Sequence, residues 1–408
     1  MSAAPGAPLE WLIIGGGIHG VHLAVRLLAE AQTQPERLRI LDPGPALLSR
    51  WRQCSTNTGM RHLRSPAVHH LDVDPWDLLA FAGANHRGKG APEGSFAPPY
   101  SRPSVALFDR HCQEIVARYG LQDLHICDRA TRVALGCDHV TVTLGEGAPI
   151  HAQRVILALG AGDQPRWPSW AIELQTHSLP IEHVFSPGFR LDPEQWPQRM
   201  AVIGGGISAA QVAMRLADAG KEVHLVTRHP LRRHQFDSDP GWIGPKYMRG
   251  FSATPDLRAR RAMITEARHP GSLPPDVHRA LRLAISQQRV QLHLGQPHAH
   301  LHQGQIVLNV AEDYFPVDGV LLATGFEGAR PGGALVDALV QSHALPCSDC
   351  GYPVVDPQLR WHPRVYVTGP LAELELGPVA RNIVGARRAA ERIVPTAIQD
   401  SAPRSYST

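Results

Sequence analysis

Short apolar segments without polar interruption recur along the chain, and glycines follow several of them. Residues 12–14 form such a segment, residues 15–20 are rich in glycine, and apolar positions within 21–28 then recur at intervals of three and four residues. An unbroken apolar run is typical of a buried parallel strand, and the three-and-four spacing is typical of one buried helix face. A second apolar strand is predicted at 38–41 and ends at Asp42. This order predicts a βαβ unit.

The glycine-rich turn of this unit fits a dinucleotide-binding site. Gly15 permits a tight turn, Gly17 lets the backbone approach a pyrophosphate, and Gly20 lets the helix pack closely on the strand. The N-terminus of the following helix then faces the phosphates. At the end of the second strand, Asp42 is placed to accept hydrogen bonds from a ribose diol. The strand and helix context makes a mere turn the weaker interpretation.

The same pattern recurs in the middle of the chain. An apolar strand at 200–203 precedes a second glycine-rich turn at 204–209, a helix face follows, and another strand is predicted at 222–227. This strand ends at Arg228 instead of an acid. An acid would repel a 2′-phosphate, whereas arginine meets it with a planar fork of donors, so the second site is expected to prefer NADPH. The competing interpretation is a solvated charge at the strand end. The residues expected at this site are Gly204, Gly206, Ala209, Arg228, Arg232 and Arg233.

Composition and charge exclude several classes of protein. The 408 residues, of which 43% are hydrophobic, are enough for two to three globular domains. A net charge of +3 without a basic tract gives no reason to expect a nucleic-acid partner. Six cysteines are too few for a secreted disulfide framework, so a cytoplasmic protein is expected. No signal peptide, membrane span or metal site is predicted.

The two turns and three further segments together resemble the two-dinucleotide-binding-domain flavoproteins. These segments are apolar strands that end in glycine at 155–160, 320–325 and 364–369. The resemblance implies FAD at the first turn, NADPH at the second, and a chain that returns to complete the FAD domain. It also implies that the backbone of Val133 holds the adenine. The residues expected at the FAD site are Gly15, Gly17, Gly20, Asp42, Val133 and Gly369.

The fold class that follows is α/β, with two Rossmann-like dinucleotide-binding domains and the NADP domain inserted into the FAD domain. The FAD domain is expected at 1–165 and 320–408, with residues 45–120 as a cap near the flavin. The NADP domain is expected at 198–320, and residues 163–197 form the connection. A terminal helix is predicted to end near Ile393, followed by a disordered tail.

Within this superfamily, the chain resembles the flavin monooxygenases more than the disulfide reductases. Residues 60–66, within the segment 51–76, resemble the loop that passes the flavin in the ornithine and lysine N-hydroxylases. Their FxGxxxHxxx(F/Y) fingerprint is missing here, and only residues 181–185 lie near its place. The resemblance implies an NADPH-dependent monooxygenase that forms a C4a-(hydro)peroxyflavin with O2 and oxygenates a small, amine-like nucleophile.

Two other functions remain open. A reductase of the same fold would pass electrons to a disulfide, a quinone or a protein partner, and a non-catalytic FAD-binding protein would act as a redox sensor. Disulfide reductases carry a redox CxxC after one of the glycine turns, whereas the CxxC here is Cys347 and Cys350, far downstream. A surface turn is the favoured interpretation of that pair.

Candidates for the substrate site come from two loops. Residues 234–246 form a Gly/Pro-rich stretch with charges and a tryptophan, which suits either a substrate site or a solvated loop between domains. His69 and His70 are expected to pack or cap, with proton transfer as the alternative. The substrate-site candidates are Met60, Arg64, Asp237, Asp239, Trp242 and Lys246.

Overall fold

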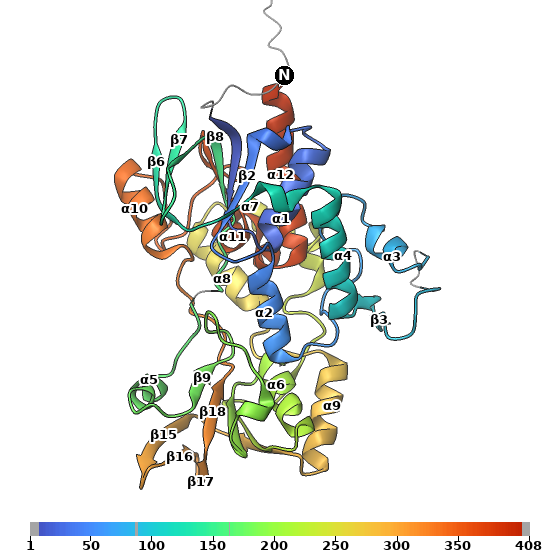
Figure 1. The fold of residues 1–408 in the computed structure, drawn as a ribbon, viewed down its shortest axis with the longest axis vertical. Coiled ribbons are helices and arrows are strands. Elements are labelled where there is room, and N and C mark those ends of the chain that lie inside the picture. The colour runs from blue at the N-terminus through green and yellow to red at the C-terminus, as the bar shows by residue number, and fades with distance from the viewer. Residues whose placement is uncertain (1–7, 86–88, 163, 402–408) are drawn as a thin grey trace, which may run out of the picture.

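A computed structural model describes residues 8–85, 89–162 and 164–401 of the chain. Its elements form two lobes, each with a mainly parallel sheet and covering helices (Figure 1). The first lobe holds both ends of the described chain, and the second lobe is built from its middle. This arrangement confirms the predicted α/β class, with one dinucleotide-binding fold inserted into another.

The sheet of the first lobe follows the strand order β19-β20-β8-β1-β2-β5. Strands β20, β8, β1, β2 and β5 are parallel, as βαβ connections require. Strand β19 pairs antiparallel with β20, and the ribbon of β6 and β7 pairs antiparallel with β8. The strand bounds are β1 Leu9–Ile14, β2 Leu38–Asp42, β5 His125–Cys127, β6 Ala130–Leu135, β7 Val140–Leu144, β8 Ile150–Leu157, β19 Arg360–His362 and β20 Val365–Val367.

Helices α1 and α12 pack against each other beside this sheet (Figure 1). The predicted disordered tail after Ile393 is wrong for residues 394–401, because α12 continues to Ser401 and buries Val394 and Ala397. The rest of that predicted tail, 402–408, lies outside the described residues. Burial of these apolar side chains offsets the conformational entropy that keeps an isolated tail disordered. The helix bounds are α1 Ile18–Ala29, α2 Ser49–Thr58, α3 Asp77–Phe81, α4 Val105–Arg118, α10 Gly333–His343, α11 Glu373–Leu376 and α12 Ile383–Ser401.

The second lobe has a five-stranded parallel sheet in the order β14-β11-β10-β18-β9. Alternate residues of β10 face opposite sides, so Met200 and Val202 join the core with α6, while Ala201 and Ile203 join the core with β16. Strand β9 falls within the segment 163–197, for which a connection is predicted. The bounds are β9 Ile181–His183, β10 Arg199–Ile203, β11 Glu222–Thr227, β14 Val290–Leu294, β15 Pro297–His302, β16 Gln305–Val310, β17 Asp313–Val317, β18 Gly319–Leu322, α5 Ser169–Gln175, α6 Ile207–Asp218 and α9 Pro275–Ser286.

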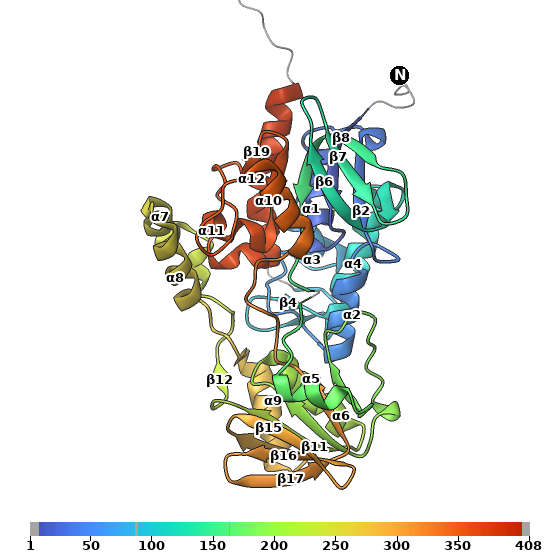
Figure 2. The same cartoon turned by 90° about the vertical axis from the view of Figure 1, so that its left-hand side faces the viewer.

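A helical excursion, residues 234–272, leaves the second lobe and packs on the first. Its helices α7 (Pro245–Ala253) and α8 (Leu257–Ala267) lie beside α11 (Figure 2). The short strands β12 (Arg232–Arg233) and β13 (Ser272–Leu273) pair where the excursion begins and ends. The excursion therefore places side chains from the middle of the chain next to its C-terminal segment.

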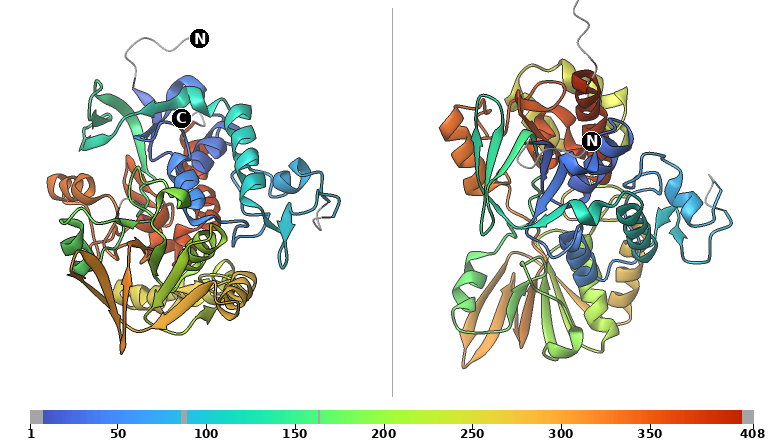
Figure 3. Two further views of the ribbon diagram at one scale, coloured as in Figure 1. Left: turned by 60° about the horizontal axis from the view of Figure 1, so that its bottom comes forward. Right: turned by 45° about the horizontal axis from the view of Figure 1, so that its top comes forward.

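A second extension, around α3 and the ribbon of β3 (Phe96–Ala97) and β4 (Arg102–Pro103), projects from the side of the molecule in both views of Figure 3. It belongs to the segment 45–120, for which a cap is predicted. Arg102 in β4 is almost fully buried and pairs with Asp276 at 2.9 Å. Because Asp276 begins α9, this ion pair connects the extension to the second lobe.

Candidate functional site

The first glycine turn has the shape that a bound dinucleotide requires. Gly15 adopts a φ of +117°, where a side chain is strained. A Cβ on Gly20 would lie 1.8 Å from the carbonyl oxygen of Gly15, so the close helix and strand contact depends on glycine. A Cβ on Gly17, in contrast, would meet no atom within 4 Å. The backbone thus leaves space beside Gly17, at the N-terminus of α1, where a pyrophosphate would bind.

Asp42 fixes this turn from the end of β2. Its Oδ2 accepts the backbone N–H of Gly16 at 2.7 Å, and its Oδ1 accepts that of Gly44 at 2.7 Å. Each carboxylate oxygen has a further lone pair, so a ribose hydroxyl can still donate to the same group. Asp42 therefore fits both the support of the turn and the ribose contact predicted for it.

A side chain inside the first turn links it to the C-terminal segment. His19 Nδ1 lies 2.8 Å from Oγ1 of Thr368, directly before Gly369. Gly369 has a φ of +64° and faces the His19 ring. Burial lowers the pKa of His19 to about 4, so this imidazole is neutral at pH 7. Neither His19 nor Thr368 was predicted as a site residue from the sequence, although a polar residue within a glycine turn was a usable signal.

The second glycine turn repeats the backbone geometry with different surroundings. Gly204 has a φ of +150°, and a Cβ there would lie 2.4 Å from the carbonyl oxygen of Ala323. A Cβ on Gly206 would lie 3.5 Å from the Cα of Gly271 in the excursion. Ala209, in the position of the third glycine, is buried in the core between sheet and helix.

Polar side chains surround this second turn. Arg228 is exposed at the end of β11, and Arg232 and Arg233 are exposed in β12. The ring of His229 lies against both Gly205 and Gly271, since a Cβ on either glycine would collide with it. His229 was not predicted as a site residue from the sequence, although it follows Arg228 directly.

Val133 lies in the antiparallel ribbon attached to the first sheet. Its side chain is buried, and its register partner in β7 is Val142. The structure thus places it in the first lobe, on an element that β7 joins to β8.

Of the substrate-site candidates, Arg64 and Asp237 lie where the two lobes meet the excursion. Arg64 donates to the carbonyl oxygens of Gln235 and His234 at 3.1 and 2.8 Å, and to Oγ of Ser272 at 3.0 Å. Oδ1 of Asp237 accepts from the Asn382 amide at 3.2 Å. Asn382 directly precedes α12, so Asp237 reaches the C-terminal segment of the first lobe.

The remaining candidates lie in other surroundings. Asp239 accepts the N–H of Gly241 at 2.7 Å and caps a short turn of helix. Trp242 is buried in the apolar cluster between the excursion and the first lobe. Lys246 is exposed, with its ammonium 4.7 Å from the Tyr247 ring centre. Met60 is half-buried against the core of the first lobe.

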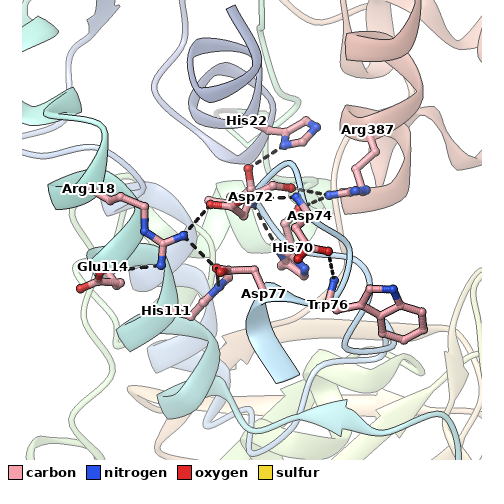
Figure 4. A network of polar contacts seen from close by, with 11 residues as sticks. His22, His70, Asp72, Asp74, Trp76, Asp77, His111, Glu114, Arg118 and Arg387 are labelled. Carbon is pink, nitrogen blue, oxygen red and sulfur yellow. Dashed lines mark hydrogen bonds and ion pairs between the residues drawn. The ribbon is translucent and has the colours of Figure 1, made fainter. Parts of the chain in front are cut away.

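A network of buried histidines and aspartates holds the loop around residues 70–77 (Figure 4). His111 Nε2 lies 2.7 Å from Oδ2 of Asp77, and Arg118 bridges Asp72 and Asp77 at 3.0 and 3.2 Å. His70 is fully buried, and its Nδ1 accepts the N–H of Asp72 at 3.2 Å. Burial lowers the pKa of His70 to about 3. This is the packed and capping role expected for it.

The same loop is tied to the helices that flank the first turn. Nδ1 of His22, on α1, lies 2.8 Å from the carbonyl oxygen of Leu71. Arg387, on α12, donates to the carbonyl oxygens of Asp72 and Val73 at 2.6 and 3.0 Å. The network therefore fastens the loop to α1 and α12 (Figure 4).

A buried carboxylate, Glu373, sits between the excursion and the first lobe. Arg268 and Arg381 donate to it at 2.8 and 2.9 Å, and Arg261 also contacts it. Burial by itself raises the pKa of this carboxyl, but the hydrogen bonds and charges of Arg381, Arg268 and Arg261 outweigh burial and lower the pKa to about 2. Three cations around one anion hold α8 against the first lobe.

No group of three or more histidine, cysteine or acidic side chains suited to a metal ion occurs among the residues the structure describes. The six cysteines are all free thiols. In the described segments, no helix is both long and apolar enough to span a membrane.

Two protein families match parts of the chain. An FAD-NAD(P)-binding family matches residues 12–162, and the pyridine nucleotide-disulphide oxidoreductase family matches residues 199–249. Each match covers one of the two glycine turns. A search of curated proteins gives no match.

Several solved structures share the whole fold. Ornithine hydroxylase (PvdA) from Pseudomonas aeruginosa has a TM-score of 0.74 at 17% identity, over 96% of this chain and 99% of that chain. Bacillithiol disulfide reductase Bdr (YpdA) from Bacillus cereus has a TM-score of 0.63 at 15% identity, over 97% and 100%. A flavin-containing monooxygenase from Stenotrophomonas maltophilia has a TM-score of 0.61 at 19% identity, over 97% and 99%.

These findings define the class of protein. The chain is a flavoprotein of the fold with two dinucleotide-binding domains, and the predicted resemblance to this fold is confirmed. It is an oxidoreductase whose cofactors are FAD and NADPH. Monooxygenases and disulfide reductases share this fold, so the fold by itself does not choose between their reactions.

Proposed function

We propose that the protein is an NADPH-dependent flavin monooxygenase that transfers one oxygen atom of O2 to a small, amine-like nucleophile. When bound, FAD would supply redox chemistry and oxygen activation, with NADPH as the source of electrons. The protein supplies binding, orientation and the exclusion of water. This reaction requires neither an acid–base pair nor a redox disulfide in the protein.

The placement of the cysteines carries this proposal. A reductase that relays electrons through a redox CxxC needs two thiols that can exchange with each other near the flavin. Among the described residues of α1 and α2, which follow the first turn and β2, the only cysteine is Cys54, and burial raises its pKa. The one CxxC pair, Cys347 and Cys350, lies in a turn between α10 and β19. The TM-score of the ornithine hydroxylase, 0.74 against 0.63 for the bacillithiol disulfide reductase, agrees with this choice.

The residues of the first turn fit FAD. Gly17 leaves space for the pyrophosphate, Asp42 is placed to accept the ribose hydroxyls, and the N-terminus of α1 provides backbone N–H groups. Gly369 and the adjoining Thr368 lie next to this turn through His19. We assign Val133 to the adenine end because it lies in the same lobe.

The second turn suits NADPH. Gly204, Gly206 and Ala209 shape the backbone at the N-terminus of α6. Arg228 is free to reach a 2′-phosphate from the strand end, and Arg232 and Arg233 add positive charge nearby. Arg64 and Asp237 lie where the first lobe meets the excursion, and we propose that they line the approach of the substrate.

Oxygen consumption distinguishes this function from the alternatives. Purified holoenzyme with NADPH, placed in an oxygen electrode with amines and amino acids, should consume O2 in step with hydroxylated product. A reductase would oxidise NADPH only when a disulfide or quinone is added, with no substrate-dependent O2 uptake. A redox sensor would not turn over NADPH with any acceptor. Either of the last two results would overturn the monooxygenase proposal.

The reductase remains the second candidate because of one feature. Solved disulfide reductases share the fold over nearly the whole chain, and this chain does contain a CxxC. Replacing both cysteines by serine decides whether that pair takes part in turnover.

A further inference from the structure

The turn that carries Cys347 and Cys350 faces the arginine cluster around Glu373. The N–H of Ser348 donates to the carbonyl oxygen of Tyr352 at 2.9 Å, and the N–H of Gly351 donates to that of Ser348 at 2.8 Å. Cys347 also forms an isolated bridge with Pro353. These contacts close a tight turn that holds both thiols, three positions apart, on one short piece of chain.

The two thiols of this turn lie in different surroundings. Cys350 is exposed, and its Sγ lies 3.1 Å from Oγ of Ser348. Cys347 is half-buried and packs against the core of the first lobe. Exposure together with a neighbouring donor is typical of an attacking thiol, and a second thiol three positions away is typical of a resolving one.

The cluster supplies positive charge to Cys350. The guanidinium of Arg261 lies 4.0 Å from the Tyr352 ring centre, beside the turn. Its Nε and Nη2 are buried and have no hydrogen-bond partner among the described residues. Burial opposes ionisation of Cys350, but the contact with the Ser348 hydroxyl and the positive charge of Arg261 outweigh it, so the pKa of this thiol lies below its ordinary value. Burial raises the pKa of Cys347.

We propose that Cys350 is a peroxide-reactive thiol and that Cys347 resolves it, so that this turn forms a reversible disulfide. The Cys350 thiolate attacks hydrogen peroxide. An S–O bond forms, the O–O bond breaks, and the departing hydroxide takes a proton to become water. Cys347 then displaces the hydroxyl from the Cys350 sulfur as a second water, and the S–S bond forms. Two thiols are oxidised by two electrons, and one peroxide is reduced to two waters.

This modification site does not depend on the reaction proposed for the flavin. The peroxide is a reagent from outside the turn, and neither cysteine takes part in FAD or NADPH binding in the proposal above. Ionised Cys350 would share the Arg261 guanidinium with Glu373. Formation of the disulfide would leave that guanidinium to Glu373 alone.

Rates of alkylation on the reduced holoenzyme at pH 7 test the first step. Peptide mapping after limited iodoacetamide treatment should show Cys350 labelled about 10-fold faster than Cys127 and Cys137, because the rate follows the thiolate fraction. Those two cysteines are also exposed and serve as references within the same molecule. Arg261→Ala and Ser348→Ala should each slow the alkylation of Cys350 and leave the alkylation rates of Cys127 and Cys137 unchanged. Equal rates for the three cysteines in the unmodified sequence would overturn the proposal.

Hydrogen peroxide tests the second step. The holoenzyme should lose 2 Da and yield a peptide with Cys347 joined to Cys350, and a thiol reductant should reverse the change. In Cys347→Ser, dimedone should trap a sulfenic acid on Cys350, whereas in Cys350→Ser the Cys347 thiol should stay reduced. If Arg261→Ala fails to retain FAD, Arg261→Lys and Ser348→Ala decide the matter. Oxidation of Cys127 or Cys137 before Cys350 would contradict the proposal.

Discussion

The two glycine turns share one backbone design, yet their surroundings differ. At the first, Asp42 holds the turn through the N–H of Gly16, and His19 ties it to Thr368. At the second, Arg228 is exposed and Gly206 lies against Gly271 of the excursion. The first turn is braced by its own lobe, whereas the second is lined by an exposed cation and by a segment that crosses between lobes.

This difference matches two different uses of one fold. A resident cofactor such as FAD profits from a site that is already ordered, because no ordering entropy is then lost on binding. A cofactor that must arrive and leave in each cycle needs an accessible site that recognises one charged group. On this interpretation, the residues around each glycine turn, and not its glycines, distinguish a resident dinucleotide from an exchanging one.

The largest expected effect comes from replacing the middle glycine of each turn. Gly17→Val should leave the fold intact, because a Cβ there meets no atom within 4 Å, but should abolish FAD binding by filling the pyrophosphate space. Absorbance at 450 nm after purification and circular dichroism measure the two effects. The matched variant Gly206→Val should keep its FAD and lose reduction by NADPH. A fully yellow Gly17→Val protein would show that the first turn is misassigned.

Acid should weaken the first lobe. Burial lowers the pKa of His70 to about 3 and that of His19 to about 4, against about 6.5 in an unfolded chain. The unfolded state therefore binds more protons, so the stability is fully present above pH 6.5 and is lost as the pH falls toward these values. At pH 5 the fully buried His70 is expected to reduce the free energy of unfolding by about 2 kcal/mol relative to pH 7.

Thermal unfolding and FAD release between pH 7 and pH 5 measure this loss. His19→Ser, which copies Ser208 of the second turn, should reduce the pH dependence of FAD release. His302→Ser serves as the control, since His302 is exposed in β15. A pH dependence that is the same in His19→Ser and in the unmodified protein would contradict the role of the buried imidazole.

Removing the charge at the second turn should have a smaller effect. Arg228→Ala should lower the NADPH to NADH ratio of kcat/KM by about 10- to 100-fold, because a hydrogen bond to a charged phosphate contributes about 1.5–3 kcal/mol. Steady-state kinetics with both nucleotides provide the measurement, and Arg232→Ala and Arg233→Ala show whether the role is shared. If the ratio of kcat/KM for NADPH to that for NADH is unchanged in all three variants, the assignment of the 2′-phosphate to this strand end is wrong.

The smallest effect is expected from the cysteines. Cys347→Ser with Cys350→Ser should keep both NADPH-driven flavin reduction and O2 consumption, because neither thiol belongs to either turn. Stopped-flow flavin reduction and an oxygen electrode compare it with the unmodified protein. A double variant that is folded and FAD-loaded but fails to turn over with any acceptor tested would favour the reductase.

The sequence by itself determined the elements whose signals are local. Unbroken apolar runs and glycine spacing predicted β1, β10 and both turns, because a tight turn against a helix requires glycine wherever it occurs. The exchange of Asp42 for Arg228 at matching strand ends was also visible in the sequence. The extension of the terminal helix beyond Ile393 was not visible in the sequence, since it depends on burial of Val394 and Ala397 against the rest of the first lobe.

Only the tertiary structure decided which distant residues meet. Residues 234–246 are a Gly/Pro-rich stretch in the sequence, but the structure buries Trp242 and brings Asp237 to Asn382, 145 positions away. Glu373 and its arginines likewise come from separate segments, and no local pattern records an ion pair between them. A glycine turn is determined by the conformations of a few neighbouring residues, whereas a buried charge cluster depends on how whole elements pack.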